Sequence, residues 1–181
     1  FRVAAVMRLD PDKSPLLLLR ATALVKEKIG AQGFELLVAG AGSLAEHLKQ
    51  AAEELGVSDC VVWLGQVNDV QGLLESTHVY VNPSAFPQTW AISNLEAFSA
   101  GAAVVAFDRG GPGEYLEDEE NCVVPKTHSP HGLANAMLRL LGDDELRRKT
   151  VEGGKKTLRE GGFTMKEMVE KYARLYKGLK Y

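Results

Sequence analysis

The chain has 181 residues, of which 45% are hydrophobic and 25% are charged, so it can bury one sizeable core and is short for two. No apolar run approaches the roughly 20 residues that a membrane helix needs, and no nucleic-acid partner is expected of this chain, whose formal net charge is −3. Cys60 and Cys122 lack partners at the spacing of a disulfide framework or a zinc site, which favours a reduced, cytoplasmic setting.

Short β-rich runs alternate with helical patterns through the first two thirds of the chain. Residues 1–9 resemble a strand rather than a signal peptide, and this abrupt start suggests a piece of a longer polypeptide. Strands are predicted at residues 2–8, 34–40, 60–65, 78–84, 102–108 and 121–125. Helices are predicted at residues 14–30, 43–56, 69–77 and 92–101. The alternation predicts an α/β fold: a doubly wound, mainly parallel, Rossmann-like sheet of about six strands, with helices on both faces and its ligand beyond the carboxyl ends of the strands.

After residue 128 the strands stop, and helices are predicted at residues 130–142, 143–161 and 163–181. Asp143 is expected to cap the second of them, and Thr164 to form a capping box with Glu167 at the start of the third. The tail from residue 145 is rich in Lys and Arg, which fits a solvated helix face, an acidic membrane surface or a contact with another domain. We expect one domain covering residues 1–181.

The first predicted strand ends in the segment MRLDPDKS. Arg8 and Lys13 would lie above the carboxyl edge of the sheet near a helix N-terminus, where they could clamp a diphosphate or simply be exposed cations. The D-x-D pattern in this segment occurs in some metal-dependent sugar transferases. We expect Pro11 to shape a turn instead, with Asp10 or Asp12 capping the helix, and no bound metal.

Two glycine-rich turns follow other strands. Gly40, Gly42 and Ala45 satisfy the dinucleotide fingerprint G-x-G-x-x-[G/A], but no acidic residue follows the next strand to hold a ribose, which argues against NAD. These glycines then need only permit a tight turn, close to a ligand if one binds there. In residues 107–114, FDRGGPGE, backbone N–H groups could face a phosphate or sugar, or the glycines could form an ordinary turn.

The order of these segments carries a resemblance to a known family. MRLDPDKS, LLVAGAGSLAEHLKQAAEELGVSDCVVWLGQV, VYVNPSAFPQTWAISNLEAFSAGAAVVAFDRGGPGEYLEDEENCVVP and DDELRRKTVEGGKKTLREGGFT together resemble the carboxyl-terminal domain of the group 1 glycosyltransferases, family 4. The resemblance runs from about residue 3 to residue 176. It implies the donor-binding half of a retaining enzyme with the two-Rossmann-domain (GT-B) architecture.

The resemblance also implies roles for individual positions. Arg8 and Lys13 match the basic pair that holds the donor diphosphate, and Gln66 and Val67 fall where the family contacts the base. Glu96 matches the second acid of the E-x7-E motif, which binds the ribose hydroxyls. Backbone N–H groups from Thr89 to Ile92 lie where the family contacts phosphate and sugar. The donor-binding positions implied are Arg8, Lys13, Gly40, Gln66, Val67, Gln88, Trp90, Ala91, Ile92 and Glu96.

Gln88 stands where the family has the first acid of E-x7-E, which contacts the donor sugar. Glutamine keeps the length and one acceptor oxygen but loses the charge that stabilises a cationic transition state, and it gains an NH2 donor. A variant tuned to a different sugar, a loss of catalysis and a one-residue misalignment all fit this change. Trp90 and Ala91 replace the usual Phe-Gly pair, and Trp90 fits a core residue under the helix better than a sugar-stacking residue.

The function implied is metal-independent transfer of a hexose-type sugar from a nucleoside diphosphate, with retention of configuration. Arg8, Lys13 and Gln88 are the implied catalytic residues, and no cofactor is expected. The resemblance implies an N-terminal acceptor-binding domain that is absent here, so this chain should bind donor weakly without turnover. The parent is expected in the cytoplasm or at the cytosolic face of a membrane, with peripheral contact.

Two alternatives belong to other classes. Gln88 would suit a non-catalytic nucleotide-sugar binding or scaffolding module, whereas Gly40, Gly42 and Ala45 alone favour an NAD-dependent oxidoreductase or epimerase. The base, the sugar and the acceptor stay open, since this fold serves many pathways. The apolar side of the last helix, including Met168, Tyr172, Leu175 and Leu179, would be partly unprotected in this chain and would favour self-association.

Overall fold

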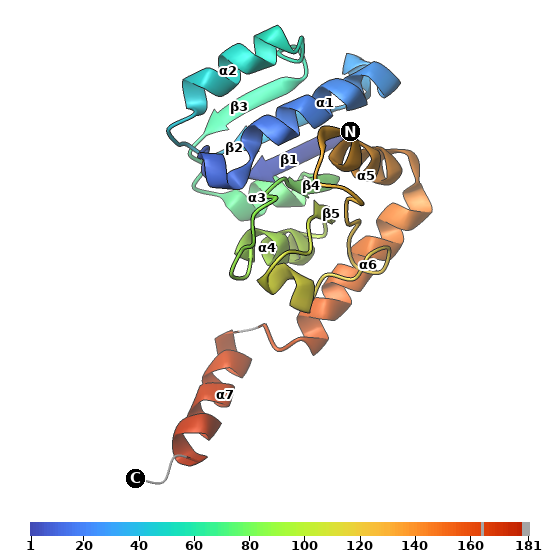
Figure 1. Cartoon of the computed structure of the whole chain (residues 1–181). Coiled ribbons are helices and arrows are strands. Elements are labelled where there is room, and N and C mark those ends of the chain that lie inside the picture. The colour runs from blue at the N-terminus through green and yellow to red at the C-terminus, as the bar shows by residue number, and fades with distance from the viewer. Residues whose placement is uncertain (164, 179–181) are drawn as a thin grey trace.

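A computed structural model describes residues 1–163 and 165–178 (Figure 1). Five parallel strands form one sheet in the order β3-β2-β1-β4-β5. The strands are β1 (Arg2–Val6), β2 (Glu35–Ala39), β3 (Val61–Gly65), β4 (Val79–Asn82) and β5 (Ala103–Ala106). The α-helices are α1 (Pro15–Ile29), α2 (Ala45–Glu54), α3 (Val70–Glu75), α4 (Ile92–Ala100), α5 (Pro130–Gly142), α6 (Asp144–Glu160) and α7 (Met165–Gly178). Short 3-10 turns are η1 (Pro11–Lys13), η2 (Ala31–Gly33) and η3 (Gly111–Glu114).

Alternate strand residues pack into two separate cores, one on each face of the sheet. Val3 and Val105 belong to the core that α1, α2 and α5 cover, whereas Tyr80 and Val104 belong to the core that α3 and α4 cover. Every residue of β4 and β5 is buried, as is typical of parallel strands covered on both faces. Figure 1 shows the helices on both sides of the sheet, which confirms the predicted doubly wound, Rossmann-like class.

The prediction of a sixth strand at residues 121–125 is wrong. Val123 forms an isolated parallel bridge with Val105, and its N–H donates to Val104 O at 2.8 Å. The ladder stops there because Pro125, the next residue whose N–H would face β5, has no N–H to donate. The Val124 N–H, on the other side of the segment, donates to the Asp118 carboxylate at 2.8 Å. The segment therefore lies beside β5 without extending the sheet, which has five strands.

Helix starts follow the predicted capping chemistry in part. Asp143 caps α6, since its Oδ1 accepts the Leu146 N–H at 2.9 Å, as predicted. Ser129 caps α5 in the same way through the Gly132 N–H at 3.1 Å. The capping box expected of Thr164 lies outside the described residues.

The last helix, α7, projects away from the sheet in Figure 1 and buries none of its described side chains. Met168, Tyr172 and Leu175 are exposed, as expected, and Leu179 lies outside the described residues. In the described ranges 1–163 and 165–178, no helix combines the length and the apolar character needed to cross a bilayer. Self-association through α7 stays a prediction.

Candidate functional site

Two adjoining open cavities lie beyond the carboxyl end of β1, the edge where a doubly wound sheet is expected to bind its ligand. We name them after one lining residue each: the Gln88 cavity, of about 540 Å³, and the Gln66 cavity, of about 420 Å³. Val6 and Met7 line both of them, so the two spaces meet at the end of β1. An elongated ligand could therefore occupy both.

The predicted site residues divide between these cavities. Arg8, Gly40, Gln66 and Val67 line the Gln66 cavity. The Gln88 cavity is lined by Lys13, Gln88, Trp90, Ala91 and Ile92.

Glu96 is the exception among the predicted positions. It lies one turn beyond Ile92 on α4, is exposed, and is not among the residues that line either cavity. Its role toward a ribose stays a prediction.

Arg8 and Lys13 share a carboxylate partner between the cavities. The Arg8 guanidinium contacts Asp10 Oδ2 at 2.7 Å and Asp12 Oδ2 at 3.1 Å, and Lys13 Nζ lies 3.2 Å from Asp12 Oδ2. The 3-10 turn η1 makes this cluster, because it folds Asp12 back beside both cations. An anion that binds here must therefore compete with Asp10 and Asp12 for the cations.

The predicted capping role of the D-x-D aspartates is not what the structure shows. Asp10 is at the N-cap position of η1 but makes no side-chain cap bond. Its Oδ1 instead accepts the backbone N–H and the hydroxyl of Ser43, both at 2.9 Å. The Ser43 N–H is the main cause that holds the pKa of Asp10 below its ordinary value. Asp10 thus stays ionised and ties the turn after β1 to the turn after β2.

Gly40 serves the packing of these two turns. Its φ is +139°, and a Cβ there would overlap the Met7 carbonyl oxygen. A Cβ at Gly42 would likewise press on the backbone of Leu9. The glycine fingerprint is therefore explained by close approach of two chain segments, without a dinucleotide.

A buried polar chain supports the loop that lines the Gln88 cavity. Asn82 Nδ2 donates to Asn94 Oδ1 at 2.9 Å and to Gln88 Oε1 at 3.1 Å. Asn94 Nδ2 donates to the Tyr115 hydroxyl at 3.1 Å, which donates to Trp90 O at 2.7 Å. We call Asn82, Gln88, Asn94, Tyr115 and Trp90 the amide chain. It joins the end of β4, the first turn of α4 and the segment after η3.

Three members of the amide chain were not predicted from the sequence as part of the site: Asn82, Asn94 and Tyr115. Asn82 and Asn94 each interrupt an apolar segment, VYVN and ISNLEAF, and such isolated amides in buried positions are the signal available in the sequence. Nothing in the sequence alone brings the three side chains together.

The glycine turn at residues 110–113 supports the same loop. The Gly111 N–H donates to Gln88 O at 2.9 Å, and the Gly113 N–H donates to Gly110 O at 3.0 Å. These N–H groups are therefore occupied within the protein, so the interpretation that they face a ligand is wrong for Gly111 and Gly113. A Cβ at Gly111 would overlap the Thr89 carbonyl oxygen, so glycine is required where the two segments meet.

Trp90 and Ala91 form the tip of the loop. Trp90 is 40% exposed, so its interpretation as a core residue under the helix is wrong. Its ring stacks on Tyr115, with centroids 6.1 Å apart, and meets Phe163 edge-on at 5.8 Å. Ala91 has φ +48° and ψ +62°, the left-handed conformation that favours glycine.

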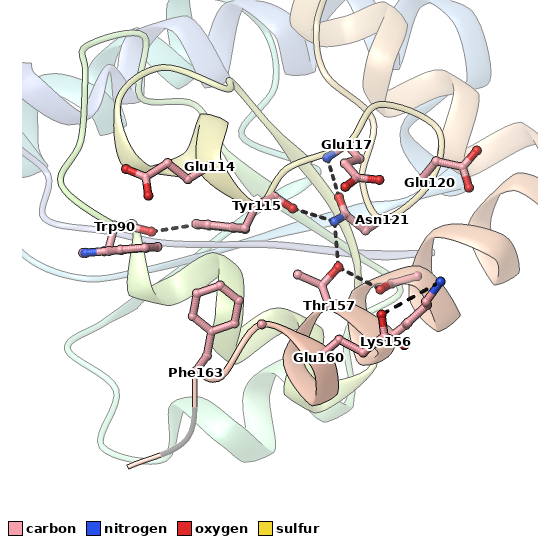
Figure 2. A pocket seen from close by; sticks show the side chains of 12 residues that line it. Trp90, Glu114, Tyr115, Glu117, Glu120, Asn121, Lys156, Thr157, Glu160 and Phe163 are labelled. Carbon is pink, nitrogen blue, oxygen red and sulfur yellow. Dashed lines mark hydrogen bonds and ion pairs between the residues drawn. The ribbon is translucent and has the colours of Figure 1, made fainter. Parts of the chain in front are cut away.

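Behind Trp90 lies another cavity, of about 490 Å³, shown in Figure 2. Figure 2 shows the Tyr115–Trp90 bond on one side of it and Asn121 joined to Thr157 on the other. The charged side chains that line it are one cation, Lys156, and four carboxylates, Glu114, Glu117, Glu120 and Glu160. Acidic groups disfavour an anion, so this space is unsuited to phosphate. Trp90 separates it from the Gln88 cavity, since Trp90 lines both.

Comparison with known proteins gives a consistent family. The model of the family Glycosyl transferases group 1 matches residues 1–157. An uncharacterized glycosyltransferase of Methanocaldococcus jannaschii is 33% identical over 157 residues, which are 86% of this chain and 39% of that protein. The chain is also similar to two solved structures. One is a mutant of S. aureus TarM in complex with fondaparinux, alpha-GlcNAc-glycerol and UDP, with a TM-score of 0.88 and 25% identity over 97% of this chain and 35% of that chain.

The other is Anabaena HepE in complex with UDP, with a TM-score of 0.89 and 21% identity over 99% of this chain and 49% of that chain. At that level of identity the likeness shows the fold alone. The chain spans less than half the length of each of these three relatives.

Proposed function

This chain belongs to the group 1 glycosyltransferases, as the carboxyl-terminal donor-binding domain of a GT-B enzyme, and from that membership we propose that its two adjoining cavities hold one nucleoside diphosphate sugar. One observation carries the proposal: every implied donor position except Glu96 lines one of the two cavities at the end of β1. The base occupies the Gln66 cavity, and the sugar occupies the Gln88 cavity. The diphosphate lies at the junction.

Arg8 and Lys13 suit the diphosphate because each lines one of the two cavities. The two cations also lie close together, since both contact the same carboxylate oxygen, Asp12 Oδ2. Their charges would neutralise the departing nucleoside diphosphate, which is the electrostatic assistance that such a transfer needs. We propose that the parent enzyme transfers a hexose-type sugar with retention of configuration and without a metal or another cofactor. Gln88 and Glu96 contact the sugar and the ribose.

Uridine diphosphate is the nucleotide that we propose to test first. The TarM mutant, at 25% identity, is in complex with fondaparinux, alpha-GlcNAc-glycerol and UDP, which supports UDP as the first choice. GDP and ADP remain the competing bases.

The chain spans less than half the length of each relative, and we propose that the acceptor lies against a part of the parent outside these residues. We propose that the chain alone binds donor without turnover. We place the parent in the cytoplasm, in peripheral contact with a membrane's cytosolic face where its acceptor is lipid-linked.

A non-catalytic nucleotide-sugar binding module is the second candidate, and Gln88 is the observation that favours it. The amide lacks the negative charge that stabilises an oxocarbenium-like transition state. Binding of donor by the full-length parent without any transfer would identify that module. The NAD-dependent alternative loses its support, because Gly40 and Gly42 are explained by packing against Met7 and Leu9.

Calorimetric titration of this chain with UDP, GDP and ADP tests the proposed function. We expect one nucleotide to bind, and Arg8→Ala to weaken it about 10- to 100-fold, as the loss of a charge-assisted bond worth about 1.5–3 kcal/mol predicts. Glu96→Ala should also weaken binding if Glu96 holds the ribose. Arg148→Ala is the matched control, because Arg148 is exposed and lies near the amino end of β4, beside Thr77 and His78. Equal effects of Arg8→Ala and Arg148→Ala, or no binding of any nucleotide at millimolar concentration, would contradict the proposal.

A further inference from the structure

The contact between Ser84 and Asn82, at one end of the amide chain, determines which atom donates and which accepts in each hydrogen bond of the chain. The Ser84 backbone N–H, which can act only as a donor, bonds Asn82 Oδ1 at 3.2 Å. Asn82 must therefore turn its NH2 toward its other two partners, Asn94 Oδ1 at 2.9 Å and Gln88 Oε1 at 3.1 Å. Gln88 thus contributes its carbonyl oxygen to the chain.

The second end fixes the same direction independently. The carbonyl oxygen of Trp90 can only accept, so the Tyr115 hydroxyl donates its hydrogen there, at 2.7 Å. That hydroxyl must then accept from the Asn94 NH2 at 3.1 Å, which leaves Asn94 Oδ1 to face Asn82. Asn94 is fully buried and Asn82 is 8% exposed, so reversing either amide would bury unsatisfied polar groups at about 1–3 kcal/mol each.

Because Asn82 occupies the Gln88 oxygen, the Gln88 NH2 is the polar group left for a ligand in the Gln88 cavity. Gln88 is half-buried and lines that cavity, and in the described part of the chain no group bonds its amide nitrogen. A glutamate here would accept the same Asn82 bond and offer its second oxygen to the ligand. Gln88 therefore offers a hydrogen-bond donor where a glutamate would offer an acceptor.

The charge of the cavity points the same way. None of the residues that line the Gln88 cavity is acidic, and its one charged side chain, Lys13, lies 3.2 Å from Asp12 Oδ2 and is assigned to the diphosphate. An acidic side chain would accept hydrogen bonds from neutral sugar hydroxyls and would repel a carboxylate on the ligand. The lining of the Gln88 cavity has no acidic side chain, so it does neither. A ligand oxygen that accepts a bond from Gln88 and carries negative charge fits best.

We propose that Gln88 determines sugar specificity, and that the donor sugar is a uronic acid whose carboxylate accepts a hydrogen bond from the Gln88 NH2. The inference rests on the proposed function, since it places the sugar in the Gln88 cavity. It assigns Gln88 to ground-state recognition of the sugar, with Asn82 as the positioning residue that sets the direction of its amide.

Titrations with epimer-matched donors test this inference. UDP-glucuronate is compared with UDP-glucose, and UDP-galacturonate with UDP-galactose, because each pair differs only at C6. Each affinity is divided by that of UDP on the same protein, and the wild type is compared with Gln88→Glu. We expect the uronate of at least one pair to bind about tenfold more tightly than its neutral partner in the wild type, and Gln88→Glu to reverse that preference through charge repulsion.

Gln32→Glu supplies a matched control, since Gln32 is exposed in η2, just before the amino end of β2, and gains the same charge. It should leave the sugar preference as in the wild type. Thermal unfolding of both variants separates misfolding from a change in specificity. If UDP binds but neither uronate is preferred, or if Gln88→Glu leaves the preference unchanged, the inference is overturned while the proposed function stands. If UDP does not bind, the proposed function falls for this base, and the inference of a UDP-uronate falls with it.

Discussion

Gly111→Ala is expected to weaken binding of the nucleotide sugar by roughly 100-fold, because the added methyl group displaces the loop that lines the Gln88 cavity. A Cβ at Gly111 would overlap the Thr89 carbonyl oxygen, and the Gly111 N–H also donates to Gln88 O at 2.9 Å. These contacts involve backbone atoms, which cannot move aside as the end of a flexible side chain can. Loss of two charge-assisted hydrogen bonds from this loop, at about 1.5 kcal/mol each, gives an effect of this size.

The measurement is titration with a sugar conjugate of the nucleotide that the wild type binds, together with circular dichroism to confirm folding. Gly142→Ala is the control glycine, since a Cβ there meets no atom within 4 Å. It should bind as the wild type does. Binding by Gly111→Ala within twofold of the wild type would mean that the loop from Thr89 to Ala91 does not contact the ligand.

Asn94→Leu is expected to lower the free energy of unfolding by about 3 kcal/mol. The substitution removes one acceptor and one donor from a fully buried position, which leaves the Asn82 NH2 short of one acceptor and the Tyr115 hydroxyl without its donor. Each unsatisfied buried group costs about 1–3 kcal/mol. For a chain of this length, the midpoint of thermal unfolding should fall by about 6–12 °C.

Asn135→Leu is the matched control for denaturant and thermal unfolding. Asn135 is exposed on α5, and the same substitution there should change the free energy of unfolding by less than about 0.5 kcal/mol. An Asn94→Leu protein as stable as the control would show that the amide chain does not stabilise the loop. Asn94→Leu should also weaken the uronate preference, because Gln88 would lose the constraint on its orientation.

The doubly wound sheet could be predicted from the sequence because each buried strand is a nearly continuous apolar run between amphipathic helices. The prediction of a sixth strand failed because the pairing of a segment with the sheet depends on which partners its backbone N–H groups bond. Pro125 has no N–H to pair with β5, and strand propensity does not register this effect strongly. Propensity located the segment correctly and overestimated its pairing.

The position of the candidate site was predictable from the sequence, whereas the hydrogen bonds and ion pairs within it were not. Parallel strands end at one edge, so residues that follow different strands, such as Arg8 and Gln66, meet there. The contacts of Arg8 and Lys13 with Asp12 depend on the single turn η1, which the sequence indicates only as a proline turn. The amide chain depends on three separate elements, and no spacing rule relates Asn82, Asn94 and Tyr115.

Backbone amide mapping by NMR during titrations with UDP-glucose and UDP-glucuronate tests most directly whether the two cavities at the end of β1 form one donor site. We predict that the amides of Arg8, Gly40, Val67 and residues 88–92 shift together along one binding curve, while those of Gly153 and Thr157, which line the cavity behind Trp90, stay unchanged. Saturable shifts confined to the cavity behind Trp90, or shifts in the Gln66 cavity without any in the Gln88 cavity, would contradict a single site that spans both.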